Sequence, residues 1–214
     1  MSLSSTTFFG SSTELSTNIK VQAGPTGNIT GNALTFAQTP KTDGGQNITF
    51  TFSAPIYELS FIITDIDNGL TGDGEDGDEG FSEHDVILPA GGYTSTVPTG
   101  STVNGAGTAA SPFMNNNVQS YHTDSPGGNL KISIAGSLST FTIKFSNGLV
   151  QNGSSQRIHL TNILFKGAVC AGPESGLSRC ASQEVLVIRR RKCLVRFSYP
   201  QAEVFSFHKI MFVG

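Results

Sequence analysis

Residues 47–67 read NITFTFSAPIYELSFIITDID, and this stretch decides the fold class. Its apolar side chains recur at every second position, first at Ile48, Phe50 and Phe52 and then, after Pro55, at Tyr57, Leu59, Phe61 and Ile63. A period of two is typical of β-strands that bury one face. The stretch therefore predicts two neighbouring strands of one antiparallel sheet, with Pro55 ending the first.

The same alternation returns in 129–135, 140–146 and 157–166, and turn residues separate these runs. A chain of 214 residues with 25 Gly, no Trp and only 14% charged residues is typical of short strands joined by turns. We therefore predict an all-β fold, an antiparallel β-sandwich that is jelly-roll-like, with about ten to twelve strands.

The charge divides the chain into two parts. Residues 1–169 hold six basic and 13 acidic side chains, a net charge of −7, whereas residues 170–214 hold seven basic and three acidic ones, a net charge of +4. All three cysteines lie in the second part. We predict a β-sandwich domain over 1–169 and a compositionally distinct basic tail over 170–214, which either adds strands or is foreign to the domain.

An acidic stretch follows the strand pair. Nine of the 16 carboxylates of the chain lie between Asp65 and Asp85, with no Lys or Arg among them. If the alternation continues through Asp65 and Asp67, both carboxylates emerge on the core face about 7 Å apart. Buried like charges need compensation, and Ca2+ accepts six to eight oxygen ligands in such places.

We therefore predict a Ca2+ site formed by Asp65, Asp67 and Asp85, with Glu83 beside them. The alternative is a solvated acidic rim at the end of the sandwich. The carboxylates in the Gly-rich middle of the loop fit neither an EF-hand nor a tandem calcium repeat, and solvent exposure explains them. They are Asp73, Glu75, Asp76, Asp78 and Glu79.

Other function classes find little support in the sequence. No nucleophile elbow, zinc-protease motif or Cys-His pair appears in 1–169, so the chain is predicted not to be an enzyme. His159 is expected to be an ordinary sheet residue. The acidic body argues against nucleic-acid binding. No apolar run is long enough to span a membrane, and the start of the chain does not read as a signal peptide.

Three segments resemble a known family. They are the run 48–67, the run NGAGTAASPF at 104–113, and the pair GSLSTFTIKFSNG (136–148) and SSQRIHLTNILF (154–165). Over about residues 30–167 they resemble a β-sandwich module of large bacterial exported and cell-surface, adhesin-like proteins. Its most specific element here is Asp65-Ile66-Asp67 with Asp85 downstream. The resemblance implies an extracellular or cell-surface location and no known chemistry.

The sequence thus predicts a non-catalytic structural or adhesive module, monomeric and stabilised by Ca2+ in the loop 65–85. Its expected partners are a glycan or another surface protein. One alternative is a carbohydrate-binding module of a secreted enzyme or surface protein. A second is a glycan hydrolase or lyase, which would need two carboxylates facing each other across a groove.

Overall fold

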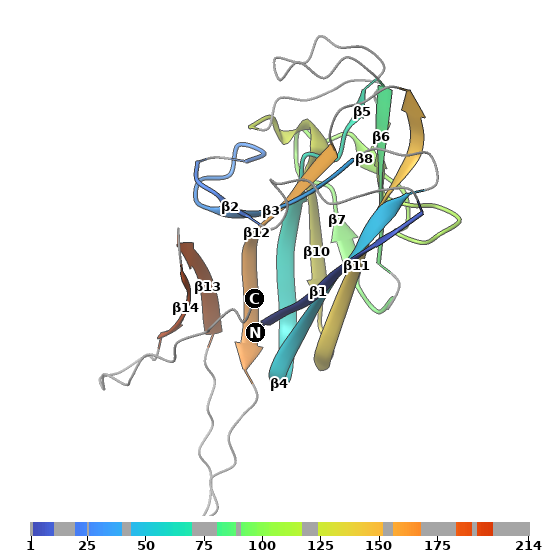
Figure 1. Ribbon diagram of the computed structural model, residues 1–214. Helices are drawn as coiled ribbons and strands as arrows, with labels where there is room; N and C mark the ends of the chain where they lie inside the picture. The colour runs from blue at the N-terminus through green and yellow to red at the C-terminus, as the bar shows by residue number, and fades with distance from the viewer. Residues whose placement is uncertain are drawn as a thin grey trace, which may run out of the picture.

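The computed structural model describes residues 2–10, 20–24, 26–39, 44–69, 81–88, 91–116, 124–151, 156–167, 183–189 and 192–198. Within these ranges the chain is almost entirely extended (Figure 1). Its strands are β1 (Ser2–Phe9), β2 (Lys20–Gln22), β3 (Ala33–Gln38), β4 (Gly45–Thr64), β5 (Asn68–Gly69), β6 (Phe81–Ile87), β7 (Thr94–Thr96), β8 (Val103–Asn104), β9 (Met114–Asn115), β10 (Leu130–Ile134), β11 (Leu138–Gln151), β12 (Gln156–Gly167), β13 (Gln183–Arg189) and β14 (Lys192–Ser198). Among the described residues, one 3-10 turn, η1, spans Pro126–Gly128.

Strand β4 connects the two layers of the molecule. Its first half pairs with β1 and β11, and its second half pairs with β10 and β12. Its pairing partners change between Thr51 and Ile56, and Figure 1 shows β4 descending and then rising again. The two alternating runs therefore do not pair with each other, contrary to the sequence prediction. Pro55 has no N–H to donate to a ladder, and it lies at the point where β4 changes partners.

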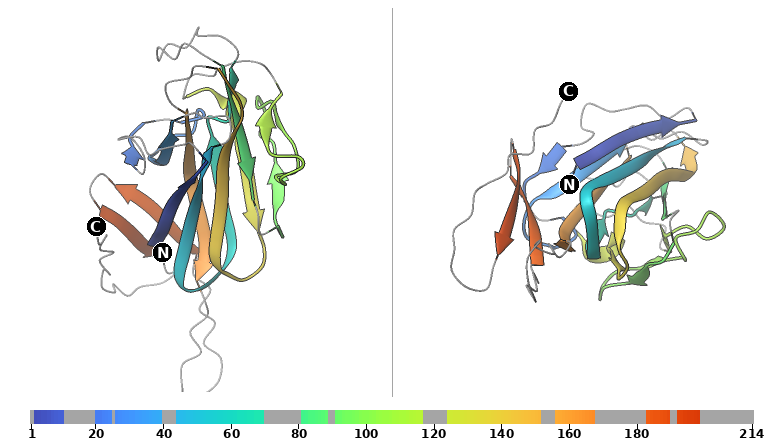
Figure 2. Two further views of the ribbon diagram at one scale, coloured as in Figure 1. Left: turned by 45° about the vertical axis from the view of Figure 1, so that its right-hand side comes forward. Right: turned by 90° about the horizontal axis from the view of Figure 1, so that it is seen from below.

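The pairing defines two layers packed face to face, and Figure 2 shows them from two further sides. The first contains β1, the first half of β4, β11, β6 and β5. The second contains β7, β10, the second half of β4 and β12, with β3 and β2 beyond one end of β12 and β13 and β14 beyond the other. All of these pairings are antiparallel. The predicted all-β antiparallel sandwich is confirmed.

Phenylalanine pairs join the two layers. The ring of Phe61 in the second half of β4 lies 5.2 Å from that of Phe141 in β11. Phe52 and Phe165 form a second pair, at 5.8 Å, and a third joins Phe36 to Phe50. A cavity of about 10 Å³ lies beside these rings and is lined only by apolar side chains. It is at most the size of one water molecule and offers that molecule no polar partner, so we expect it to be dry.

In the second half of β4, the alternation of buried and exposed side chains is interrupted once, near Glu58. Tyr57, expected on the core face, is 41% exposed, while Ile56 and Leu59 are buried. Glu58 lies between them in the left-handed region, with φ +52°. The ladder to β12 shifts its register at the same place. The sequence prediction for Tyr57 was wrong because a bulge moves the buried positions by one residue.

The tail adds a hairpin to the sandwich. Strand β13 pairs with the end of β12, and β14 pairs with β13. These two strands coincide with the two apolar runs of the tail, while Arg190 and Arg191 between them lie outside the described residues. In the part of the chain that the structure describes, no helix is long and apolar enough to cross a membrane.

Tyr93, in the segment after β6, packs against Phe113, which pairs with that strand. Its ring lies 6.1 Å from that of Phe113, and its hydroxyl donates a 2.6 Å hydrogen bond to the carbonyl of Ala106. Phe113 in turn exchanges two backbone hydrogen bonds with Val86. Burial raises the pKa of the Tyr93 hydroxyl, because desolvation disfavours the phenolate.

This shift predicts a pH dependence of stability. An acid whose pKa is raised on folding contributes stability below its unfolded pKa, about 10 for tyrosine, and loses it as the pH rises through the folded pKa. We expect the free energy of unfolding to fall above about pH 10, and to fall less steeply in a Tyr93→Phe variant. Urea unfolding across the alkaline range measures both slopes. Equal slopes in the two proteins would contradict the prediction.

Candidate functional site: the Asp65 corner

The predicted Ca2+ motif begins where β4 ends, at a residue with unusual backbone geometry. Asp65 has φ +69°, a left-handed conformation that Asp tolerates better than most residues. This turn brings Ile66 into the core, where it is fully buried. The expectation that Asp65 and Asp67 share the core face of β4 was therefore wrong. The alternation of side chains along β4 ends at Thr64, and the carboxylate of Asp65 points toward His159.

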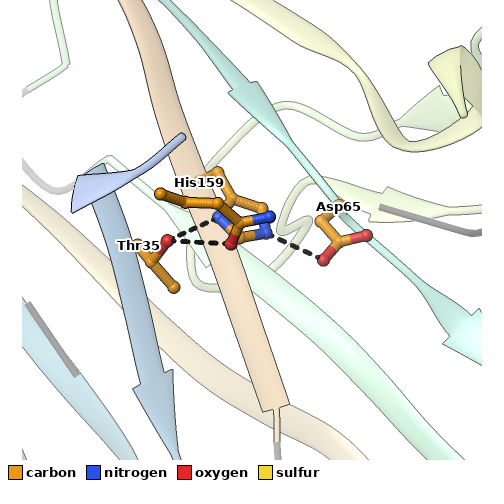
Figure 3. Close-up of polar contacts among 4 residues, drawn as sticks. Thr35, Asp65 and His159 are labelled. Atoms are coloured by element: carbon orange, nitrogen blue, oxygen red, sulfur yellow. Dashed lines mark hydrogen bonds and ion pairs between the residues drawn. The ribbon is translucent and has the colours of Figure 1, made fainter. Parts of the chain in front are cut away.

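The Asp65 carboxylate contacts the imidazole of His159. Its Oδ2 lies 3.2 Å from His159 Nε2, and the opposite ring nitrogen, Nδ1, lies 2.9 Å from Thr35 Oγ1. Figure 3 shows the ring of His159 held between Asp65 and Thr35. All three residues are buried, with exposed fractions of 5% or less. Both ring nitrogens have a partner, as buried polar groups require.

Strand register brings these residues together. His159 of β12 lies opposite Thr64 of β4 on one side and opposite Thr35 of β3 on the other. Its neighbours Ile158 and Leu160 belong to the core, so His159 projects from the other face of the layer. It is a residue of a regular strand, as expected, and it also belongs to a buried polar chain that the sequence did not predict.

Strand β2 and the turn that follows it cover this polar chain. Thr35 Oγ1 lies 3.3 Å from Gln22 Oε1, to which it can donate, and the turn from Thr26 to Ile29 follows. Gly27 in that turn packs against Thr64, and its carbonyl accepts a 2.7 Å hydrogen bond from Asn129 Nδ2. The outer face of the layer is thereby closed over His159. Without the cover, His159 would face solvent.

The backbone of Ile66 is fixed on both sides. Its N–H donates to the carbonyl of Gly128 at 3.2 Å, and its carbonyl accepts from Asn115 Nδ2 at 3.0 Å. Asn115 Nδ2 also donates to Gly127, and Asn115 Oδ1 accepts from Thr102 Oγ1 at 2.7 Å. We call Asp65, Ile66, Asn115 and η1 the corner clamp. It holds the residues that connect β4 to β5.

The structure places the other predicted Ca2+ ligands near the pairing of β5 and β6. Asp67 and Asp85 are half-buried, and Asp85 lies opposite Ser146 of β11. Glu83 lies opposite Asn68, but its side chain is outside the described residues, as are residues 70–80 of the acidic loop. Among the described residues, no three His, Cys, Asp or Glu side chains are grouped closely enough to hold a metal ion. The four-residue Ca2+ site remains a prediction.

The order Thr35, His159, Asp65 is that of a hydroxyl nucleophile, an imidazole base and an orienting carboxylate. The hydroxyl is not accessible, because Thr35 is 1% exposed and His159 is 0% exposed. An external substrate cannot reach it in this conformation.

Comparison of the chain with protein-family models, with curated proteins and with solved structures finds no match.

The close packing of Gly128 against Ile66 in the corner clamp predicts that a side chain at position 128 is destabilising. A Cβ added there would lie 2.6 Å from the backbone nitrogen of Ile66 and 2.9 Å from its carbonyl oxygen, too close for either backbone atom to accommodate. We expect Gly128→Ala to lower the free energy of unfolding by about 1–3 kcal/mol. Gly136→Ala is the matched control, since its methyl would meet no atom within 4 Å. Urea unfolding of both variants tests this, and equal midpoints would contradict the clamp.

Proposed function

We propose that residues 1–169 are a structural or adhesive β-sandwich module of an extracellular or cell-surface protein, and that the module turns over no external substrate. The burial of the Asp65–His159–Thr35 chain carries this proposal. These are the residues most able to perform chemistry, and the covering segment keeps them from solvent. Their side chains bind one another and connect β3, β12 and the turn that follows β4.

The composition supports the proposed location. The body has no cysteine and few charges, and its sequence is rich in Ser, Thr and Asn. Such a composition suits an exported protein, and the resemblance to adhesin-like modules points the same way. Carbohydrate binding is less favoured, because Tyr57 and Val97 are the large apolar side chains exposed in the described part of the chain. Glycan sites commonly offer several aromatic rings for stacking.

We further propose that Ca2+ stabilises the end of the module beside β5 and β6. The register of these strands sets Asn68 opposite Glu83, so Asp67 lies next to the 83–85 segment. Like charges in such proximity repel each other, and a hard cation with oxygen ligands removes the repulsion. We propose Asp67, Glu83 and Asp85 as its ligands, because their backbones flank the pairing of β5 with β6. Asp65 is the least needed of the four, since His159 already contacts its carboxylate.

Thermal unfolding of the full chain in millimolar Ca2+ or in EDTA tests this proposal. Ca2+ at 100 times its dissociation constant adds about 2.7 kcal/mol to the free energy of unfolding, and a chain of this size then melts several degrees higher. We expect Asp67→Asn to reduce the Ca2+-dependent shift. Asp124→Asn, which changes an exposed carboxylate outside the acidic stretch, should leave it intact.

A panel of soluble oligosaccharides in the same assay separates the two proposed roles. No change of the midpoint with any of them is expected. An oligosaccharide that raises the midpoint would favour the carbohydrate-binding module instead. If the midpoint is the same in Ca2+ and in EDTA, the proposal that Ca2+ stabilises the module is wrong.

A further inference from the structure

Four side-chain amides lie between the two layers, at the ends of the strands that carry them. Gln38 of β3 and Gln156 of β12 come from the second layer, and Gln46 of β4 and Asn147 of β11 come from the first. Each of the four is at most 7% exposed. We call them the amide cluster. Buried amides are costly unless their donors and acceptors find partners, so each polar atom of the cluster needs one.

Gln38 crosses from one layer to the other. Its Nε2 donates to Gln156 Oε1 at 3.1 Å within its own layer, and to Asn147 Oδ1 at 3.4 Å in the opposite layer. Both acceptors are oxygens, so the nitrogen of the Gln38 amide must face them. Gln38 Oε1 is therefore directed away from both, and it has no hydrogen-bond partner among the described residues.

Gln46 lies next to this crossing. It pairs with Phe145 of β11, whose side chain belongs to the core, and Asn147 follows two residues later on the same face. Gln46 and Asn147 are therefore diagonal neighbours, at a separation that long side chains can span. Gln46 is 0% exposed, yet neither its Nε2 nor its Oε1 has a hydrogen-bond partner in the part of the chain that the structure describes.

We propose that the amide cluster binds one internal water molecule, which joins Gln46 of the first layer to Gln38 of the second. The cluster presents three unpartnered atoms to it, Gln46 Nε2 as a donor and Gln46 Oε1 and Gln38 Oε1 as acceptors. A buried water typically makes about three hydrogen bonds to polar groups of this kind. The nitrogen and oxygen of one primary amide lie side by side, so a single water can accept from Nε2 while it donates to both oxygens.

Water suits the cluster better than a metal ion does. A cation would take lone pairs from the two oxygens but would repel the N–H donors of Gln46, and the four amides carry no negative charge to balance it. Their burial admits only a small ligand. The cavity beside the phenylalanine rings is the opposite case, because its lining is apolar and offers water no partner.

The bound water would give the ends of these strands a polar link between the layers, where phenylalanine pairs join the layers elsewhere. Hydrogen bonds are directional, so a cluster of this kind favours one alignment of the two layers over its neighbours. This inference goes beyond the proposed function, since it holds whether or not the module binds Ca2+ or a partner.

Water-to-protein NMR of the wild-type chain tests the proposal directly. We expect the Nε2 protons of Gln46 to show a nuclear Overhauser effect from water with the sign of a long-lived internal molecule. Comparison with the rotating-frame effect separates binding from proton exchange. The Nδ2 protons of Asn104, an exposed side chain, are the control and should show only the brief contacts of surface hydration. Gln46 protons without the effect of a long-lived water would overturn the proposal.

A substitution at Gln46 gives an independent thermodynamic readout. Gln46→Met keeps the length of the side chain and removes an amide that makes no direct hydrogen bond to the described residues. With water bound, the variant loses contacts and should melt at a lower temperature, whereas an amide buried without water is costly and its removal should raise the midpoint. Leu130→Met, at another fully buried position, measures the cost of packing methionine. A Gln46→Met midpoint at or above that of Leu130→Met would contradict the water site.

Discussion

The left-handed turn at Asp65 is the constraint on which the rest of this end of the molecule depends. A single positive φ reverses the expected direction of two side chains. Ile66 enters the apolar core, and the Asp65 carboxylate turns to His159 on the other face of the layer. Because Asp tolerates this backbone conformation, the residue can serve as both the corner of the chain and the partner of a buried imidazole.

The apolar core and the polar chain are therefore built on opposite faces of one layer. The core is closed by the opposite layer, through phenylalanine pairs such as Phe61 with Phe141. The polar chain is closed by the short segment that carries Gln22 and Gly27. Burying polar groups is costly unless each finds a partner, and here His159 finds one at both ring nitrogens. The cover is as necessary to this arrangement as the second layer is to the core.

The sequence was sufficient for the fold class and insufficient for the site. Alternation such as that of Ile48, Phe50 and Phe52 is a local property, and it predicts buried strands wherever the backbone stays regular. Positive φ at Glu58, Asp65 and Asn162 interrupts that regularity. No local pattern reveals these three interruptions.

The same limit applies to the polar chain. His159 is 94 residues from Asp65 and 124 from Thr35, and only the strand register brings them together. Asp67 and Asp85 could be proposed as Ca2+ ligands from the sequence, because clustered carboxylates are visible without a structure. The contact between Asp65 and His159 could not be predicted from the sequence. Its only signal was a histidine on the polar side of an alternating strand, which is a common position for a residue of no special role.

The contact between Asp65 and His159 is the central claim, and a double-mutant cycle measures it most directly. Asp65→Gly removes the carboxylate while suiting the left-handed backbone, and His159→Leu removes the imidazole. Urea unfolding of the wild type, the two single variants and the double variant gives the four free energies. We predict that the two effects are not additive and differ from their sum by about 0.5–3 kcal/mol. Additivity within about 0.3–0.5 kcal/mol would contradict the account.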